Sequence, residues 1–185
     1  SNDLPVTRKS YFNEKRNKKE IDNMIKILLV PSWEIAESIV QPEATVEAEY
    51  GQKVLEGSVC TLAHHTEKYR NSSAPCNTDV KPLSDNSTIV ISHIDLDTIG
   101  GCLALMGQKL QNNEFWQAAE FIDLNGPHHL YKFPEQIQDY FNGYWAWSQS
   151  QGRAPRYTTA TDVTDIILKH GEIITKILSG DQELI

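Results

Sequence analysis

The sequence predicts one α/β domain built around a short parallel or mixed sheet. Two short apolar runs, 25–30 and 88–92, have the length and composition of buried strands. A helical pattern follows the second run, and two longer helical patterns fill the C-terminal part. At 185 residues, with 39% hydrophobic and 23% charged residues, the chain can bury one sizeable core. This composition excludes collagen-like and wholly disordered chains.

The N-terminal 23 residues are predicted to lie outside this domain. They are rich in Lys and Arg and show almost no apolar periodicity, which is typical of a solvated tail. We expect residues 1–23 to be a disordered basic tail or an addition made for expression, with Met24 as a candidate internal start. Residues 24–185 then form the single domain.

The first part of the domain is predicted to be β-rich. The strand over 25–30 is stopped by a proline. Apolar and acidic residues alternate over 46–50, a turn is expected at 51–52, and strand character resumes up to Leu62, which together predict a hairpin or meander. Residues 66–87 are rich in Ser, Asn, Pro and Asp and are expected to form a long loop that is functional or mobile.

The middle of the chain predicts a βαβ unit over 88–123. It consists of the strand 88–92, a helix over 100–110 with a stripe of apolar residues, and a third short strand over 120–122. A strand, helix and strand in this order are typical of a right-handed crossover in a parallel sheet.

The C-terminal part is predicted to be helical. An aromatic-rich helix over 133–152 is expected to pack in the core or to form a subunit interface, so a homo-oligomer is one option. An amphipathic helix over 161–178 carries His170 on its apolar face, where we expect a structural role. Arg153 and Arg156, between the two helices, are candidate phosphate contacts or ordinary residues of a solvated loop.

Charge and composition narrow the classes of partner. The formal net charge of −8 disfavours bulk nucleic-acid binding and favours cationic ligands such as metals. No apolar run approaches the roughly 20 residues that cross a bilayer, so no membrane association is expected. Three cysteines are too few for a disulfide scaffold, which agrees with a reducing, cytoplasmic location. Five of the six histidines fall in three tight groups beside carboxylates, which is typical of metal ligands.

The strongest candidate ligands follow the second predicted strand. Alternating positions directly after it carry His93, Asp95 and Asp97, and an extended backbone would point all three to one side. Asp123, at the end of the neighbouring predicted strand, can add a carboxylate because ligands gather at the carboxyl ends of parallel strands. Imidazole combined with carboxylates suits Mn²⁺, Fe²⁺ or Zn²⁺. We expect a divalent metal, with Mn²⁺ favoured and Zn²⁺ or Fe²⁺ as alternatives.

Two further histidine pairs leave several options open. His128 and His129 would complete the metal site, act as a catalytic acid, or lie in a surface turn. His64 and His65 end the β-rich part and would join the main metal site, form a separate Zn²⁺ site with nearby cysteines, or have no role.

A phosphate site is expected beside the metal. Gly100 and Gly101 would let a phosphate approach the N-terminus of the following helix, where free N–H groups favour an anion. Metals placed next to such a site would activate water and stabilise a transferring phosphoryl group. Phosphoester hydrolysis of a small phosphorylated or nucleotide substrate is therefore the first reaction to consider.

The residues of the second strand and its helix resemble a known motif. The segment 89–105, IVISHIDLDTIGGCLAL, is similar to the first motif of the DHH phosphoesterase superfamily, which is a strand, His-x-Asp-x-Asp and small residues that open a helix. The resemblance implies that His93, Asp95 and Asp97 bind metal. It also places Asp123 where the aspartate of the second motif would lie.

The resemblance implies an activity as well. Members of that family use pairs of Mn²⁺ ions and cleave phosphodiester or phosphoanhydride bonds in small nucleotides, short oligonucleotides or polyphosphate. Their contiguous Asp-His-His triplet has its nearest equivalent here in Asp123 with His128 and His129, which a turn separates from the aspartate.

Two alternatives stand beside this hypothesis. The segment 93–97 could be a polar loop in which Asp97 or Thr98 caps the following helix. The whole protein could be a non-catalytic ligand-binding or interaction module that retains a degenerate metal site.

Overall fold

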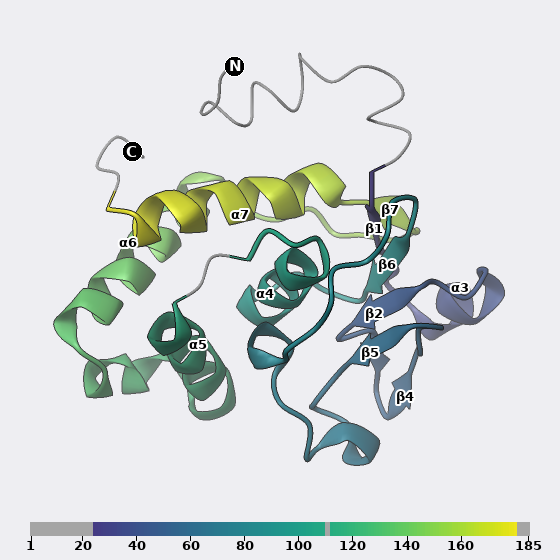
Figure 1. Ribbon diagram of the computed structural model, residues 1–185, viewed down its shortest axis with the longest axis horizontal. Helices are drawn as coiled ribbons and strands as arrows, with labels where there is room; N and C mark the ends of the chain where they lie inside the picture. Colours follow the sequence, from purple (N-terminus) through teal and green to yellow (C-terminus); the bar gives the residue numbers. More distant parts are fainter. Residues whose placement is uncertain (1–23, 110–111, 181–185) are drawn as a thin grey trace.

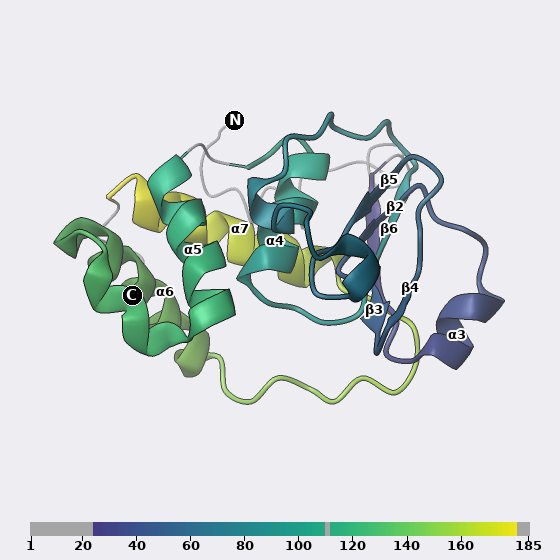
Figure 2. The ribbon, with the colours of Figure 1, turned by 90° about the horizontal axis from the view of Figure 1, so that it is seen from below.

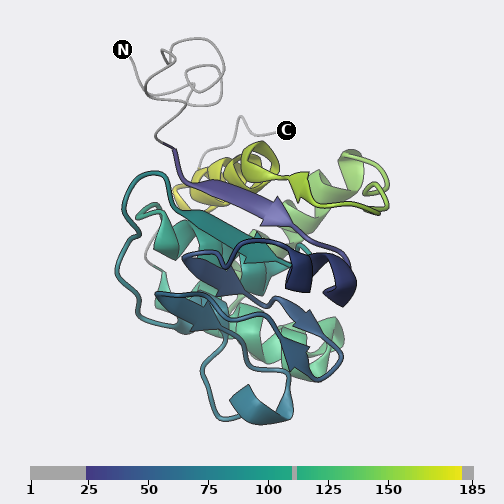
Figure 3. The same cartoon turned by 90° about the vertical axis from the view of Figure 1, so that its right-hand side faces the viewer.

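A five-stranded mixed sheet forms the scaffold of the protein. The computed structural model describes residues 24–109 and 112–180. The strands are β1 (Lys26–Leu29), β2 (Ala44–Val46), β5 (Cys60–Leu62), β6 (Thr88–Ile91) and β7 (Thr161–Asp162). Their order is β5-β2-β6-β1-β7. The first four in this order run parallel, and β7 pairs antiparallel with β1 at one edge (Figure 3).

The other elements surround this sheet. The helices are α3 (Trp33–Ser38), α4 (Leu96–Leu105), α5 (Asn113–Asn125), α6 (Glu135–Ser150) and α7 (Thr164–Leu178). Three short 3-10 turns are η1 (Glu67–Tyr69), η2 (Pro75–Asn77) and η3 (Pro127–Lys132). A small hairpin is formed by β3 (Glu49–Tyr50) and β4 (Lys53–Val54).

Alternation along the central strands gives the sheet two apolar faces. In β6, Ile89 and Ile91 pack in the main core, whereas Val90 packs in a second, smaller cluster. Helices α4, α5, α6 and α7 lie on the side of the main core, and α3 covers the opposite face (Figures 1 and 2). A strand that is buried on both faces consists of a continuous run of apolar residues, which explains why β1 and β6 could be predicted from the sequence.

The fold class predicted from the sequence is confirmed. The chain forms an α/β fold with a mixed sheet, a β-rich N-terminal part and a helical C-terminal part. The hairpin turns at 51–52 as predicted. The predicted loop 66–87 contains only η1 and η2 as regular structure, and η2 packs against α4. Residues 1–23, predicted to be a tail, lie outside the described residues.

The predicted strand at 120–122 is wrong, because these residues belong to α5. The Asn112 side chain accepts a hydrogen bond from the Phe115 backbone N–H and caps this helix. Its buried residues recur at helical spacing: Phe115, Ala118, Ala119 and Ile122. The βαβ unit expected over 88–123 therefore does not form, and the chain returns to the sheet only at the antiparallel β7.

Two consecutive glycines let α4 pack closely on its neighbours. A β-carbon added to Gly100 would lie 2.5 Å from the Cys76 β-carbon and 2.9 Å from the Trp116 ring. One added to Gly101 would lie 2.9 Å from a methyl group of Val46. Both glycines are buried in the middle of α4, where they bring the helix close to η2 and β2.

The described part of the chain shows no membrane span. Within residues 24–109 and 112–180, no helix has the length and apolar character needed to cross a bilayer. All three cysteines are free thiols, in agreement with the expectation that they form no disulfide scaffold.

We expect Gly100→Ala to lower the free energy of unfolding by about 1–3 kcal/mol, because the added methyl group overpacks a closed contact. Gly143→Ala in α6 is the matched control, since its β-carbon would find only an Ile177 methyl group at 3.9 Å. The control should be neutral or gain up to about 1 kcal/mol. Urea denaturation checks both variants, and equal stability of Gly100→Ala and the wild type would contradict the packing described.

Candidate functional site

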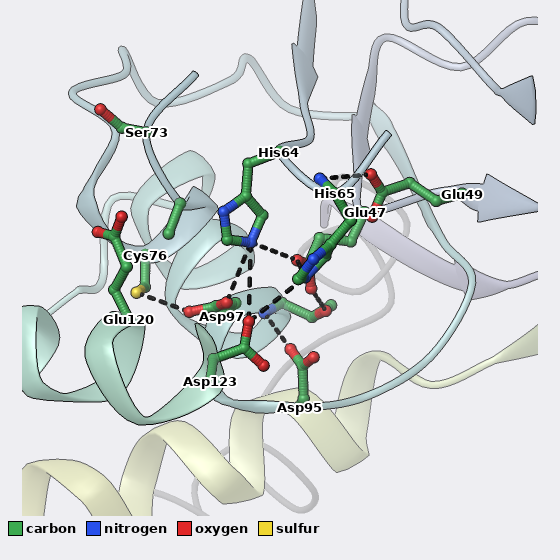
Figure 4. A network of polar contacts seen from close by, with 12 residues as sticks. Glu47, Glu49, His64, His65, Ser73, Cys76, Asp95, Asp97, Glu120 and Asp123 are labelled. Atoms are coloured by element: carbon green, nitrogen blue, oxygen red, sulfur yellow. Dashed lines mark hydrogen bonds and ion pairs between the residues drawn. The ribbon is translucent and has the colours of Figure 1, made fainter. Parts of the chain in front are cut away.

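Polar side chains converge where the parallel strands end. In the sheet Val46 lies opposite both Leu62 and Ile91, so the residues that follow β2, β5 and β6 emerge at one edge. Side chains from these three ends, from the start of α4 and from α5 meet there (Figure 4). We call this group the His/carboxylate cluster, and its members are Glu47, His64, His65, His93, Asp95, Asp97 and Asp123.

Glu47 lies at the centre of the cluster and is fully buried. Its Oε2 lies 3.2 Å from Nε2 of His64 and 3.2 Å from Nε2 of His65. Its Oε1 lies 3.4 Å from Nε2 of His93 and accepts a hydrogen bond of 3.0 Å from the Thr98 hydroxyl. A single carboxylate therefore contacts histidines from two different strand ends.

The backbone of Glu47 adopts an uncommon conformation. Its φ of 48° lies in the left-handed region, which costs a non-glycine residue about 1–2 kcal/mol. The sheet holds it there: its N–H donates a 2.7 Å hydrogen bond to the Leu62 carbonyl, and its own carbonyl accepts one from the Ser92 hydroxyl. Such strain persists where the surrounding structure fixes it, and it is common at functional sites.

His64 and Asp97 form the most buried part of the cluster. Their side chains are 3% and 1% exposed, and Nε2 of His64 lies 3.3 Å from Oδ2 of Asp97. The other Asp97 oxygen, Oδ1, accepts a 3.0 Å hydrogen bond from the buried Cys76 thiol. Asp123 borders this pair from α5, with Oδ2 3.8 Å from Nε2 of His64 and 3.3 Å from Nε2 of His65.

His93 and Asp95 form the more exposed part. Nε2 of His93 lies 2.9 Å from Oδ2 of Asp95, and Nδ1 of His93 lies 2.9 Å from the Ser92 hydroxyl oxygen. Oδ1 of Asp95 accepts a 2.8 Å hydrogen bond from the Thr98 backbone N–H and so caps α4. The cap is thus Asp95, not the Asp97 or Thr98 that the sequence suggested. Because Asp95 caps the helix and Asp97 lies in its first turn, the expected extended run over 93–97 is wrong.

In the cluster, the contacts between histidines and carboxylates outweigh the effect of burial on the pKa values of Glu47 and His64. Burial alone would raise the pKa of Glu47, but His64 and His93 outweigh it and hold that pKa well below its usual range. Burial alone would lower the pKa of His64, but the carboxylates of Asp97 and Glu47 raise it to about 10. Contacts with Asp95 and Glu47 likewise raise the pKa of His93 to about 10. Burial and the charge of Asp97 raise the pKa of Asp123 to about 7.

Two groups of side chains within the cluster could hold a metal ion. One consists of Glu47, His64, His65 and Asp97, and the other of Glu47, His93 and Asp95. In each group the potential ligand atoms lie within 4.8 Å of one another, and Glu47 belongs to both groups. Among the described residues, the buried atoms Glu47 Oε2, His64 Nε2 and Asp97 Oδ2 have no partner with hydrogen-bond geometry. A cation between these atoms would satisfy them.

Most predicted metal ligands meet in this cluster. His64 and His65 join it together with His93, Asp95 and Asp97. Neither of the two groups includes a cysteine, so the separate Zn²⁺ site of Cys and His does not form among the described residues. Asp123 also reaches the cluster, although it comes from a helix and not from a strand end.

For His128 and His129 the structure agrees with the surface-turn option, whereas the expected phosphate site at Gly100 and Gly101 differs from it. His128 and His129 lie in η3, where their ring centroids are 4.2 Å apart and His129 contacts Phe121; none of the described contacts links them to the cluster. Gly100 and Gly101 face protein atoms of η2, α5 and β2, so the open phosphate approach expected at these glycines is wrong. The helix begins four residues earlier than Gly100, at Leu96, because Asp95 caps it.

Two residues of the site, Glu47 and Cys76, were not assigned to it from the sequence. Glu47 falls within an alternation that predicts an exposed acidic face, whereas it directly follows β2 at the same edge as His93. The available signal was its position after a buried strand, the rule that identified the aspartates. Cys76, which donates to Asp97, comes from the long loop and carries no local signal.

A hollow of about 320 Å³ opens beside the cluster. Asp95, Asp97 and Asp123 line one side of it, and Tyr144 and Trp145 of α6 line the other. The side chains of Asp95 and Asp123 are 33% and 28% exposed, whereas that of Asp97 is 1% exposed.

Comparisons of this chain with protein-family models, curated proteins and solved structures find no match. The resemblance to the DHH phosphoesterases therefore rests on the motif residues alone. Of these, His93, Asp95 and Asp97 lie in the cluster. What the site can do chemically follows from its donor set, which combines imidazole nitrogens with carboxylate oxygens around one buried glutamate.

Proposed function

We propose that the protein is a metal-dependent hydrolase that cleaves a small phosphodiester or phosphoanhydride substrate. The observation that carries this proposal is that one buried carboxylate, Glu47, is shared by two adjoining groups of potential metal ligands. A shared carboxylate between two ligand groups is the arrangement that a two-metal phosphoesterase needs.

The donor atoms indicate the class of metal. His64, His65 and Asp97 would hold one ion and His93 and Asp95 a second. Imidazole-rich sets favour Mn²⁺, Fe²⁺ or Zn²⁺ over Mg²⁺ and Ca²⁺, which prefer oxygen ligands alone. We propose Mn²⁺, with Zn²⁺ and Fe²⁺ as alternatives. When bound, such ions supply an activated water and positive charge for the phosphoryl oxygens.

The protein's own groups position the reaction. Glu47, held ionised by its histidine neighbours, fixes the distance between the two ligand groups. Cys76 donates to one oxygen of Asp97 and so turns its other oxygen toward His64. Asp123 lines the hollow with a side chain 28% exposed, where it would complete the ligand set or hold the attacking water.

The variants Asp97→Asn and Asp95→Asn should each weaken metal binding at least about tenfold, and Glu47→Gln should weaken both sites. Asp139→Asn, which changes an exposed carboxylate of α6 outside the cluster, is the control and should bind as the wild type does. Elemental analysis and calorimetric titration with Mn²⁺ and Zn²⁺ measure the effect. A wild-type protein that takes up neither ion would contradict the proposed metal site.

Metal binding should release protons. His64 and His93, with pKa values of about 10, are protonated at neutral pH in the metal-free protein, whereas a metal-bound imidazole is neutral. The apparent affinity should therefore rise with pH, up to about pH 10. Titration calorimetry in buffers of different ionisation enthalpy measures the released protons. An affinity independent of pH between 6 and 9 would argue against coordination by these histidines.

Hydrolysis of bis(p-nitrophenyl) phosphate and of pyrophosphate by the Mn²⁺-loaded protein tests the activity itself. We expect turnover that falls at least about a hundredfold in Asp97→Asn, because removing one ligand misplaces both water and substrate. Asp139→Asn again serves as the control. Stoichiometric metal binding without turnover of any phosphoester would support a non-catalytic metal-binding module instead.

A further inference from the structure

A second and larger cavity, of about 730 Å³, adjoins the cluster through His93. It lies between α6, the beginning of α7 and the segment 151–157 that connects α6 to β7. This connection runs as extended chain past the helices toward the sheet in Figure 2. Because His93 lines the cavity and its Nε2 lies 3.4 Å from Oε1 of Glu47, the cavity adjoins the cluster at this residue.

One wall of the cavity is a fixed group of rings. Tyr144 and Trp147, both largely buried, lie with centroids 6.2 Å apart, and Trp147 meets His170 edge to face at 4.9 Å. Tyr144 Oη lies 2.8 Å from Nδ1 of His170, which locks the two rings together. Burial lowers the pKa of His170 to about 4, so this wall carries no charge at neutral pH. A preformed, uncharged aromatic wall suits a flat ring.

The rim of the same cavity carries positive charge. Arg153 and Lys169 line it, against the single carboxylate of Asp165. Lys169 also contacts Glu172 at 3.2 Å. No hydrogen bond or ion pair joins Arg153 to another of the described residues, which leaves its guanidinium available. Because Lys169 is paired with Glu172, the guanidinium of Arg153 is the group of this lining that favours an anionic ligand.

We propose that this cavity binds the ring-bearing part of the substrate, so that the protein acts on phosphoesters of aromatic or heteroaromatic groups. The ring packs against Trp147, and Arg153 with Lys169 compensates the negative charge of the ligand. Cleavage of the bound ester rests on the proposed hydrolase function, whereas binding of the ring in the cavity needs no metal.

The test compares phenyl phosphate with methyl phosphate, which carry the same charged group, on metal-free protein in the presence of a chelator. We expect phenyl phosphate to bind at least about tenfold more tightly, because only it buries a ring. Calorimetry measures the affinity, and the change in tryptophan fluorescence reports contact with Trp147.

Arg153→Ala should weaken phenyl phosphate binding by about tenfold, because a charge-assisted contact is lost. Arg156→Ala is the matched control, since Arg156 is an exposed arginine of the same connection that does not line the cavity. Tyr157→Ala, which removes a ring from the lining, should also weaken phenyl phosphate and leave methyl phosphate unchanged. Thermal unfolding of each variant confirms that it is folded.

Equal affinities for phenyl and methyl phosphate, or equal effects of Arg153→Ala and Arg156→Ala, would overturn the cavity proposal. Turnover of bis(p-nitrophenyl) phosphate by the metal-loaded protein could still occur in that case, and the proposed function would stand. If phenyl phosphate binding depends on Arg153 but the metal-loaded protein turns over no phosphoester, the cavity proposal is supported and the hydrolase proposal is overturned.

Discussion

The burial of one carboxylate, that of Glu47, is the constraint on which the site depends. A charged carboxylate without solvent is expensive unless positive or hydrogen-bonding partners surround it. Here His64, His65 and His93 supply these partners from the ends of two parallel strands, and the Thr98 hydroxyl adds a hydrogen bond. Because its partners come from different strands, the register of the sheet and the charge balance of the site are linked.

The packing of α4 places the carboxylates of Asp95 and Asp97 in the same cluster as Glu47. The missing side chains at Gly100 and Gly101 let the helix lie directly against β2 and η2. Its first turn then places Asp97 beside His64, while the cap residue Asp95 faces His93. Close packing in the core is therefore the physical reason why the carboxylates are near enough to the histidines to share a cation.

The surroundings of the cluster are divided by charge. The small hollow at Asp95, Asp97 and Asp123 is acidic and suited to cations, whereas the larger cavity beyond His93 has an uncharged aromatic wall and a cationic rim. The linings of the hollow and the cavity share Tyr144 and Ser148, so the two adjoin there, as a ligand that carries a ring and an anionic group would need.

The sequence by itself determined the fold class and most of the metal-ligand candidates. Runs of apolar residues with a period of two or 3.6 are local signals, and His93, Asp95 and Asp97 directly follow such a run. The strand expected at 120–122 was a misreading of local signals, because the Asn112 cap and the helical spacing of the apolar residues are both present in the sequence and outweigh a short apolar stretch. Only the tertiary structure decided the role of Glu47. Its burial depends on β5 and β6, which are distant in the chain, and its position after a buried strand did not specify which side chains would surround it.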